Sequence, residues 1–469
     1  KPFEWKDEFP EVFKRGGFDV VIGNPPYIRI QAMQEWASEQ VEFFKQKYQT
    51  ASKGNYDVYV VFVEKGLTLL NKKGVLGLIL PSKFFSTDYG EGIRKLIAER
   101  KSLSKIVDFG HLQIFEQATT YTCLLFLAGI SQDVFRYAKV NVPEELQTVE
   151  FRDIQNSFSS APWSFSDKST QNLVEKINSV SVPLHELPTR IGRGSSSGAD
   201  NVFILRKEGT KILSRDGDKV EIENEVLRQP IYATDFGRYE FRPAQEEVIV
   251  FPYEVKPDGY KLSAENEFKQ KYPKAYSYLQ SRKKELLERK QYQQWYGYSA
   301  PRNLEVHENA QILVPLLADR GLYCRLNENS SQYCLMASGG FSITVSKESK
   351  VSPNYVLGLL NSTLLFWRLR SISNVFRGGW ITCTKQYVET LPIRAINLDD
   401  PAEKSLHDKM VSLVEQMLAL HKNVGRDGIP PNEKELLERQ IKSTDRQIDE
   451  LVYQLYDLTP EEIKIVEGD

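Results

Sequence analysis

The sequence contains few of the residues on which metal sites and disulfide-rich folds depend. Its four cysteines, Cys123, Cys324, Cys334 and Cys383, are widely spaced, and only five histidines occur among 469 residues. No Cys-x-x-Cys pair or His/Cys cluster has the spacing of a zinc site. We therefore expect reduced thiols, a cytoplasmic setting and no structural metal.

Long hydrophobic runs and an excess of one charge are also lacking. The longest apolar runs, such as Val75 to Leu80 and Cys123 to Ala128, are far shorter than the roughly 20 residues that a membrane span needs. We therefore expect no membrane partner. The formal net charge is -2, which gives no hint of a nucleic-acid partner, so any basic surface must be local.

The first part of the chain, from Phe18 to Gly129, alternates short apolar runs with amphipathic stretches. This pattern is typical of a mainly parallel sheet flanked by helices, and it predicts an α/β domain over residues 1–160. The predicted strands are Phe18–Gly23, Gly74–Pro81, Lys105–Gly110 and Tyr121–Ala128. The last two should form a hairpin that closes the sheet edge. The predicted helices are Gln34–Tyr48, Asp57–Leu70 and Glu91–Lys101.

From about residue 161 the sequence changes to short strands, loops rich in Gly, Ser and Asn, and many aromatic residues. We expect an α+β domain over residues 161–395, with a long polar helix at Asn266–Tyr292. Two further helical patterns, Ala402–His421 and Asn432–Tyr456, are joined by a segment rich in Gly and Pro. They predict a C-terminal helical hairpin over residues 396–469 that packs on the rest of the protein.

The tetrapeptide Asn24-Pro25-Pro26-Tyr27 follows the first predicted strand, at the carboxyl end where open α/β sheets bind ligands. An adenine amine is a poor nucleophile because its lone pair is delocalised into the ring. The Asn24 side-chain oxygen and the Pro25 carbonyl can accept the two amine hydrogens, and the prolines hold these acceptors in place. Tyr27 supplies a face on which a base flipped out of duplex DNA can stack. The alternative is that the two prolines only mark the turn that ends the strand.

The stretch FDVVIGNPPYIRIQ resembles the catalytic motif of gamma-class adenine-specific DNA methyltransferases, and Lys53–Tyr59, Gly74–Phe85 and Ile106–Leu127 resemble later elements of that family. In the last of these, the family has an aromatic residue that stacks on the opposite face of the flipped adenine. By this resemblance the residue is Phe115, although it could also be an ordinary core residue at the mouth of a hairpin. We expect Asp57 to be the N-cap of its helix rather than a catalytic residue.

The resemblance implies S-adenosyl-L-methionine as cofactor, yet the family's cofactor motifs are missing. A complete member has a Gly-containing loop and an acidic residue before the catalytic motif. The Gly-rich segment Ile191–Gly198 does not replace them, because it leads into a strand-like run rather than a helix. The cofactor-binding residues are unknown, with Asn24 and Pro25 as candidates. We expect the chain to be the downstream part of a longer enzyme, and to bind the cofactor poorly by itself.

A local excess of basic residues, interleaved with aromatic ones, occurs between Asn266 and Asn303. This mixture suits phosphate contacts, although a solvated helix would have the same composition. The order of segments from IGRGSSSGADNVFIL to ETLPIR, over Thr189–Arg394, resembles the TaqI-like specificity domain, which recognises the target sequence. This resemblance implies that two loops approach DNA. The DNA-binding candidates are Arg193, Ser195, Ser196, Arg282, Lys283, Arg289, Lys290, Arg377 and Trp380.

Asp258, Glu267 and Lys269 match the residue pattern of a metal-dependent nuclease core. That chemistry needs the carboxylates on adjacent strands, so that their oxygens share Mg²⁺. Ala264–Tyr278 has a polar, helical pattern instead, broken by Pro273. We therefore expect no metal here, and a nuclease domain of the parent enzyme would lie upstream of Lys1.

Together these patterns predict site-specific methylation of adenine N6 in double-stranded DNA, as part of a restriction-modification or phage-defence system. Two alternatives stay open. Asn-Pro-Pro-Tyr also serves methyltransferases that act on a protein glutamine, but those proteins are small and have no use for a domain such as Thr189–Arg394. The chain could also be a DNA-binding specificity module without activity of its own.

Overall fold

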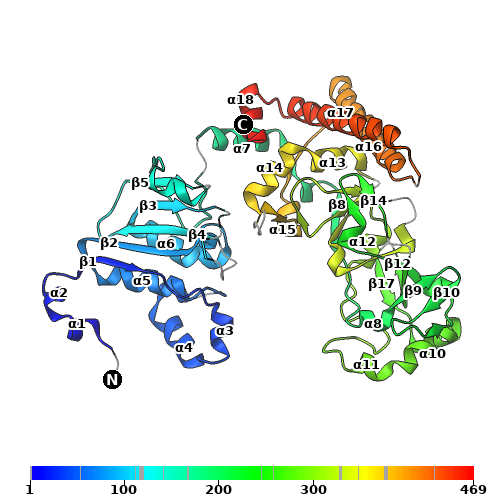
Figure 1. Cartoon of the computed structure of the whole chain (residues 1–469), viewed down its shortest axis with the longest axis horizontal. Helices are drawn as coiled ribbons and strands as arrows, with labels where there is room; N and C mark the ends of the chain where they lie inside the picture. Colours follow the sequence, from blue (N-terminus) through cyan, green and yellow to red (C-terminus); the bar gives the residue numbers. More distant parts are fainter. Residues whose placement is uncertain are drawn as a thin grey trace. The chain divides into compact units, whose positions relative to one another are not determined.

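The computed structural model describes residues 3–52, 54–110, 112, 114–115, 121–140, 142–165, 168–243, 246–256, 258–326, 330–346, 348–373, 379–426 and 428–468. The chain forms two compact units, Lys1–Asp167 and Lys168–Asp469. Figure 1 shows sheets and helices in both units, and a helical region at the C-terminal end of the second. The fold is therefore a mixed α/β fold with a helical C-terminal region.

A six-stranded sheet in the order β1-β2-β4-β3-β5-β6 forms the centre of the first unit. Its strands are β1 (Phe18–Gly23), β2 (Leu70–Pro81), β3 (Leu103–Asp108), β4 (Thr122–Ala128), β5 (Val134–Lys139) and β6 (Arg152–Gln155). β1 runs parallel to β2 and β3 runs parallel to β5. The other three pairs are antiparallel, so the prediction of a mainly parallel sheet is wrong.

The four predicted strands are all present, and β3 and β4 form the predicted antiparallel hairpin. This hairpin does not close the sheet edge, because β4 lies between β2 and β3 while β5 and β6 continue the sheet beyond β3. β5 and β6 were not predicted because their patterns are weak: β6, for example, contains the single apolar residue Ile154. The sheet is mixed because β4 is antiparallel to both of its neighbours, β2 and β3, while β5 adds a parallel pair and β6 an antiparallel one.

Six helices accompany this sheet within the described residues of the first unit. They are α1 (Trp5–Glu8), α2 (Pro10–Lys14), α3 (Ile30–Gln34), α4 (Ser38–Lys47), α5 (Tyr59–Leu69) and α6 (Glu91–Arg100). Buried side chains of α5 and α6 share one hydrophobic core with Leu76, Leu78 and Leu80, alternate residues of β2. The N-cap of α5 is Val58 and has no side-chain cap bond, so the prediction that Asp57 caps this helix is wrong.

β1 forms an open edge of the sheet, and one of its faces is apolar and exposed. Val20 and Ile22 expose 64% and 83% of their surface. Val75 of β2, which pairs with Val20 and therefore lies on the same face, exposes 37%. The opposite face of β2 is buried under α5 and α6. An exposed patch made of several large apolar side chains is unusual on a protein surface and is therefore informative.

Two larger sheets form the second unit, in the orders β11-β10-β9-β15-β12-β21 and β20-β18-β22-β8. Their strands are β8 (Thr189–Arg193), β9 (Ile204–Glu208), β10 (Lys211–Leu213), β11 (Lys219–Val220), β12 (Leu227–Ile231), β15 (Glu247–Val250), β18 (Ile312–Val314), β20 (Cys324–Arg325), β21 (Tyr333–Leu335) and β22 (Phe341–Val345). Two-stranded pairs accompany them: β13 (Phe236–Gly237) with β14 (Glu240–Phe241), β16 (Tyr253–Lys256) with β17 (Gly259–Leu262), β19 (Leu317–Ala318) with β23 (Ile381–Thr382), and β24 (Pro392–Arg394) with β7 (Ser181–Pro183).

The predicted long helix Asn266–Tyr292 is wrong. Three short helices replace it: α9 (Glu265–Lys271), α10 (Pro273–Ser281) and α11 (Lys283–Leu287). Pro273 stands at the first position of α10, where its missing N–H is no loss, whereas inside one continuous helix it would break a hydrogen bond. The other short helices of the second unit are α7 (Lys168–Ser179), α8 (Asp200–Phe203), α12 (Leu304–Glu308), α13 (Pro353–Asn361), α14 (Thr363–Ile372), α15 (Lys385–Val388) and α18 (Pro460–Glu467).

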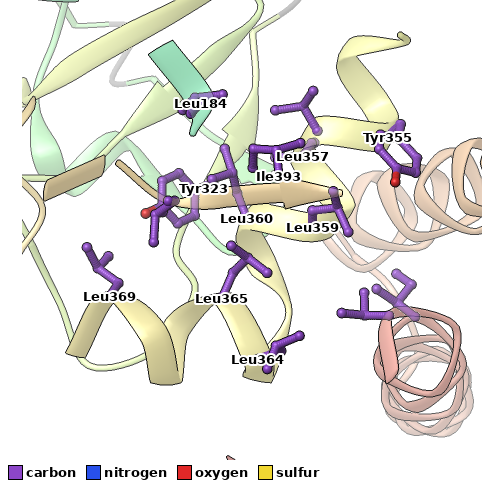
Figure 2. Packing of buried hydrophobic residues seen from close by; sticks show 14 of the residues in the cluster. Leu184, Tyr323, Tyr355, Leu357, Leu359, Leu360, Leu364, Leu365, Leu369 and Ile393 are labelled. Carbon is purple, nitrogen blue, oxygen red and sulfur yellow. The ribbon is translucent and has the colours of Figure 1, made fainter. Parts of the chain in front are cut away.

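The predicted C-terminal helical hairpin is confirmed as α16 (Pro401–Val424) and α17 (Pro431–Leu455). Its buried face belongs to the same hydrophobic core as α13 and α14, whose leucines gather near Ile393 in Figure 2. A Cβ on Gly358 of α13 would lie 2.5 Å from the sulfur of Met410, so glycine permits the close approach of α13 and α16. Within the described part of the chain, no helix has the length and apolar character to cross a bilayer.

We predict that the hairpin is held by its buried face. Ile448 of α17 is fully buried in the shared core, whereas Leu436 of the same helix exposes 56% of its surface. Ile448→Ala should lower the free energy of unfolding by about 2–5 kcal/mol, because it leaves a cavity. Leu436→Ala should change it by about 0.5 kcal/mol or less. Urea unfolding of the two variants tests this, and equal losses would show that α17 contributes little to the core.

Candidate functional site

The loop Asn24 to Tyr27 leaves the end of β1 and is anchored to β2. The Tyr27 hydroxyl donates a hydrogen bond to the carbonyl oxygen of Ile79, at 3.1 Å. Burial raises the pKa of Tyr27 to about 12, so the hydroxyl stays protonated and keeps this bond at neutral pH. Pro25 is buried while Asn24 is exposed. The loop is therefore fixed while its amide side chain stays accessible.

A second anchor follows the loop directly. The amide of Ile30 donates to the carbonyl of Tyr56 at 3.0 Å, and the amide of Val58 donates to the carbonyl of Ile28 at 2.8 Å. These bonds form an isolated antiparallel bridge between Arg29 and the segment before α5. Both ends of the loop are thus held by backbone hydrogen bonds, which limits how far Asn24 can move.

Phe115 lies against Tyr27, although the two residues are far apart in the sequence. The ring centroids are 6.2 Å apart and the ring planes are inclined by 66°. The structure therefore brings together the two aromatic residues that the sequence analysis assigned to the flipped base. The contact is edge-to-face, so a base between parallel rings would require the two rings to move apart.

The carboxyl group of Asp57 lies beside this loop. Burial raises the pKa of Asp57, while the nearby positive charges of Lys83 and Arg29 act in the opposite direction. The Tyr89 hydroxyl donates to Oδ2 of Asp57 at 3.5 Å, a long bond. The position of Asp57 beside the loop has no local signal in the sequence, because the bridge between Arg29 and Asp57 joins segments that are far apart along the chain.

The Gly-rich segment Gly192–Gly198 overlaps the end of β8. Its second residue, Arg193, is the last residue of that strand and has an exposed side chain. The carbonyl oxygen of Arg193 accepts hydrogen bonds from Nδ2 of Asn303 and Nε2 of His307, each at 3.1 Å. Nδ1 of His307 in turn accepts from the Ser342 hydroxyl at 2.7 Å. Burial lowers the pKa of His307 to about 4, so the ring is neutral and has one tautomer. The backbone of Arg193 is therefore fixed while its side chain faces solvent.

The serines of this segment lie deeper than the sequence suggested. Ser195 is fully buried, and its Oγ accepts a hydrogen bond from the amide of Arg302 at 2.9 Å. Ser196 is half-buried, and its amide donates to the carbonyl of Ala300 at 3.0 Å. A Cβ on Gly194 would lie 2.1 Å from the carbonyl oxygen of Met336, so this position requires glycine. The Ser195 side chain stabilises the segment and does not reach the surface.

Arg282 and Arg289 also serve the fold of the second unit. Arg282 forms ion pairs with Asp216 at 2.8 Å and Glu285 at 3.3 Å. Arg289 donates to several backbone carbonyl groups, those of Ser197, Gly297, Trp295 and Leu286. The guanidinium of Arg289 therefore holds the Gly-rich segment against the loop that follows α11.

Of the four remaining DNA-binding candidates, three have accessible side chains and one lies outside the described residues. Lys283 is exposed, with its ammonium 4.7 Å from the ring centroid of Trp295. Lys290 is exposed as well. Trp380 is exposed just before β23, whereas Arg377 of the same loop lies outside the described residues. The accessible candidates are therefore Arg193, together with these two lysines and Trp380.

The nuclease-like residues Glu267 and Lys269 are not on a strand, where a metal-dependent nuclease core would need them. Glu267 and Lys269 lie on α9, a helix, as their polar pattern suggested. Among the residues that the structure describes, no three His, Cys, Asp or Glu side chains gather closely enough to hold a metal ion. The four cysteines are buried and unpaired.

Comparison with known families decides what this arrangement resembles. Residues 1–115 match the family model of the Eco57I restriction-modification methylase. Residues 260–393 match the TaqI-like C-terminal specificity domain. The chain resembles a restriction-modification methylase. The two matches confirm both resemblances found in the sequence. The first match contains Asn24 to Tyr27, and the second lies within Thr189–Arg394, the segment that resembles a specificity domain.

Similar proteins with curated names include type II restriction-modification methyltransferases. The chain is 29% identical to the type II restriction enzyme and methyltransferase RM.Eco57I of Escherichia coli, over 94% of this chain and 46% of that protein. It is 22% identical to the type II methyltransferase M.BstVI of Geobacillus stearothermophilus, over 98% of this chain and 77% of that protein. The fold is similar to that of the type IIL restriction-modification enzyme MmeI, solved in complex with DNA, with a TM-score of 0.59, 10% identity and coverage of 99% of this chain and 58% of that one. The chain thus spans less than half the length of RM.Eco57I.

We predict that His307 makes the second unit sensitive to acid. Its pKa is lower in the folded protein than the usual value near 6.5, so the unfolded chain binds more protons. The stabilisation that neutral, buried His307 gives to the folded protein is therefore complete above about pH 6.5 and is lost as the pH falls towards about 4. When the pH falls from about 7.5 to about 5, the free energy of unfolding of the wild-type protein should decrease by about 2 kcal/mol more than that of His307→Gln. Urea unfolding at both pH values measures this difference. An identical pH dependence in the two proteins would contradict it.

Proposed function

We propose that this chain supplies the catalytic loop and the specificity unit of an enzyme that methylates adenine N6 at a defined sequence in double-stranded DNA. The enzyme would belong to a restriction-modification or phage-defence system. The observation that carries this proposal is the exposed amide of Asn24, on a loop that is anchored at both ends, with the rings of Tyr27 and Phe115 beside it. The relatives named above are type II restriction-modification methyltransferases, which supports DNA as the substrate.

The loop fits the amine side of this reaction. Oδ1 of Asn24 and the carbonyl oxygen of Pro25 accept the two hydrogens of the amine and draw its lone pair away from the ring. Positive charge develops on the nitrogen as the new bond forms, and two fixed oxygen acceptors stabilise that charge better than mobile water does. Tyr27, with its hydroxyl held by Ile79, offers a ring face to the base that leaves the duplex.

The described residues do not fit a complete site for S-adenosyl-L-methionine, which would supply the electrophilic methyl group. A cofactor loop needs free backbone amides at the start of a helix. In the Gly-rich segment Gly192–Gly198, the amides of Ser195 and Ser196 already donate to Leu335 and Ala300. Only Asn24 and Pro25 are left as candidate contacts, at the exposed end of β1.

We place the missing cofactor-binding part of the enzyme against the edge of β1. The strand has one unpaired edge, and Val20, Ile22 and Val75 leave an apolar strip on the adjoining face. An added strand would pair with the free backbone groups of β1 and cover this strip. RM.Eco57I has more than half of its length outside the aligned region, which is room for such a part and for a nuclease domain.

The second unit is the proposed DNA reader. Arg193, Lys283 and Lys290 have accessible cationic side chains, and Trp380 is exposed. Lysine and arginine side chains contact phosphates, and arginine can also read guanine in a groove. The match to a specificity domain disfavours a protein glutamine as the substrate. The incomplete cofactor site keeps one alternative in place, namely that this chain alone acts only as a DNA-binding module.

We predict that Asn24 acts on the amine and not on the duplex. In an enzyme complete with its cofactor-binding part, Asn24→Ala should lower methyl transfer by about 10²–10³-fold, because one acceptor is lost from the transition state. Asn24→Asp keeps an acceptor oxygen at the same place and should retain more activity. DNA binding should be unchanged in both variants. Transfer of labelled methyl groups and a gel-shift assay measure the two effects, and near-normal turnover of Asn24→Ala would refute the assignment.

A second prediction concerns the cofactor. Titration calorimetry of this chain alone with S-adenosyl-L-methionine should give no measurable heat of binding. Addition of the cofactor-binding part should restore binding, and Ile22→Glu should prevent that restoration because it places a charge in the apolar strip. Phe43→Glu, which charges another exposed apolar residue of the same unit, is the matched control. Tight binding by the chain alone would place the cofactor elsewhere.

A further inference from the structure

A cavity of about 430 Å³ lies in the second unit, between the β13–β14 hairpin and the end of α16. Aromatic and cationic side chains line it together. The aromatic group comprises Tyr239, Phe241 and His421, and the cationic group comprises Arg242, Arg325 and Lys422. Among the described lining residues, Glu240 supplies the carboxylate. None of these residues was a site candidate in the sequence, because they come from separate segments.

The wall formed by the hairpin is rigid. Tyr239, at its tip, has φ of 59°, a conformation that is strained for a bulky residue and persists only where the surroundings impose it. Here the amide of Tyr239 donates to the carbonyl of Tyr323 at 2.9 Å. The neighbouring Arg238 bonds to the carboxylate of Asp445 on α17 and to the carbonyl of Gly321. The cavity is therefore built by the fold and not by a mobile loop.

The charges in the cavity favour an anion. Among the described lining residues, three side chains are cationic and one is a carboxylate, and Arg325 donates from Nη1 to the carbonyl of Gln311. Burial lowers the pKa of His421, which favours the neutral ring. Arg242 pairs with Glu240, and its guanidinium lies against Gly425, just after the end of α16. Lys422 is exposed and has no ion pair among the described residues. Its ammonium group is thus available to a ligand.

We propose that this cavity binds a nucleoside phosphate. Lys422 and the two arginines would hold the phosphate, and the rings of Phe241 and His421 would contact the base or the sugar. The ligand has two sources with the same chemistry, a nucleotide unit of DNA or a free nucleotide. The inference does not depend on methyl transfer, since it concerns binding by the second unit.

The test uses the full chain and the variant Lys422→Glu. Lys409→Glu, on the same helix α16 and equally exposed, is the matched control. The probes are a DNA duplex, titrated at several salt concentrations, and ADP, followed by calorimetry. If DNA occupies the cavity, Lys422→Glu should weaken duplex binding several-fold and reduce the slope of log affinity against log salt by about one unit. Lys409→Glu should leave both unchanged.

The remaining outcomes also decide the proposal. Loss of ADP binding in Lys422→Glu, with unchanged binding of the duplex, supports the proposal with a free nucleotide as the ligand. Unchanged binding of both probes overturns it. Thermal melting of the two variants checks that each is folded, and Lys422→Gln, which removes the charge without reversing it, should show a smaller effect of the same sign. Because each readout is binding by this chain, a failure of the proposed methyl transfer would leave these results unaffected.

Discussion

The parallel pairing of β1 with β2 is the constraint on which the position of the loop Asn24 to Tyr27 depends. In this register Gly23 stands beside Leu78, so the loop that follows β1 emerges next to Ile79, the residue that accepts the Tyr27 hydroxyl. A shift by one residue would move Val21 to the exposed face and Tyr27 away from its acceptor. The position of Asn24 is thus set by a strand register and not by contacts of its own side chain.

The second unit uses a different device to hold its surface residues. Backbone carbonyl groups of the Gly-rich segment accept hydrogen bonds from side chains that lie underneath, those of Asn303, His307 and Arg289. These donors are fixed by their own partners or by burial. An exposed residue such as Arg193 can therefore be replaced without disturbing its support, which suits the proposed role of this surface in discriminating among DNA sequences.

The sequence was most informative where chemistry and fold depend on adjacent residues. The strand Phe18–Gly23 and its loop, the hairpin of β3 and β4, and the C-terminal helices were all predicted from local patterns. The resemblance assigned Phe115 and Tyr27 to opposite faces of a flipped base, and the structure places the two rings beside each other. Local patterns could not show that Ser195 is buried or that Arg289 is tied to backbone carbonyls, because both facts depend on segments far away in the sequence.

The order of strands was the other feature that local patterns could not give. A hairpin pattern shows that two strands pair, but it does not show which other strands lie on either side. The position of β4 between β2 and β3 could therefore not be predicted from the residues of β4 alone. The cavity beside α16 is hidden for the same reason, since Tyr239, Arg325 and Lys422 come together only in the folded unit.

The open edge of β1 also bears on how this chain behaves in solution. A flat apolar edge strand can pair with the same strand of another molecule, and Asp19 is the only charged residue within Phe18–Gly23 to oppose such pairing. Concentrated solutions of the isolated chain are therefore prone to edge-to-edge aggregation. If the proposed cofactor-binding part covers this strip, a chain without that part would present the strip to chaperones and proteases in a cell. Correct assembly would thereby govern how much of the protein accumulates.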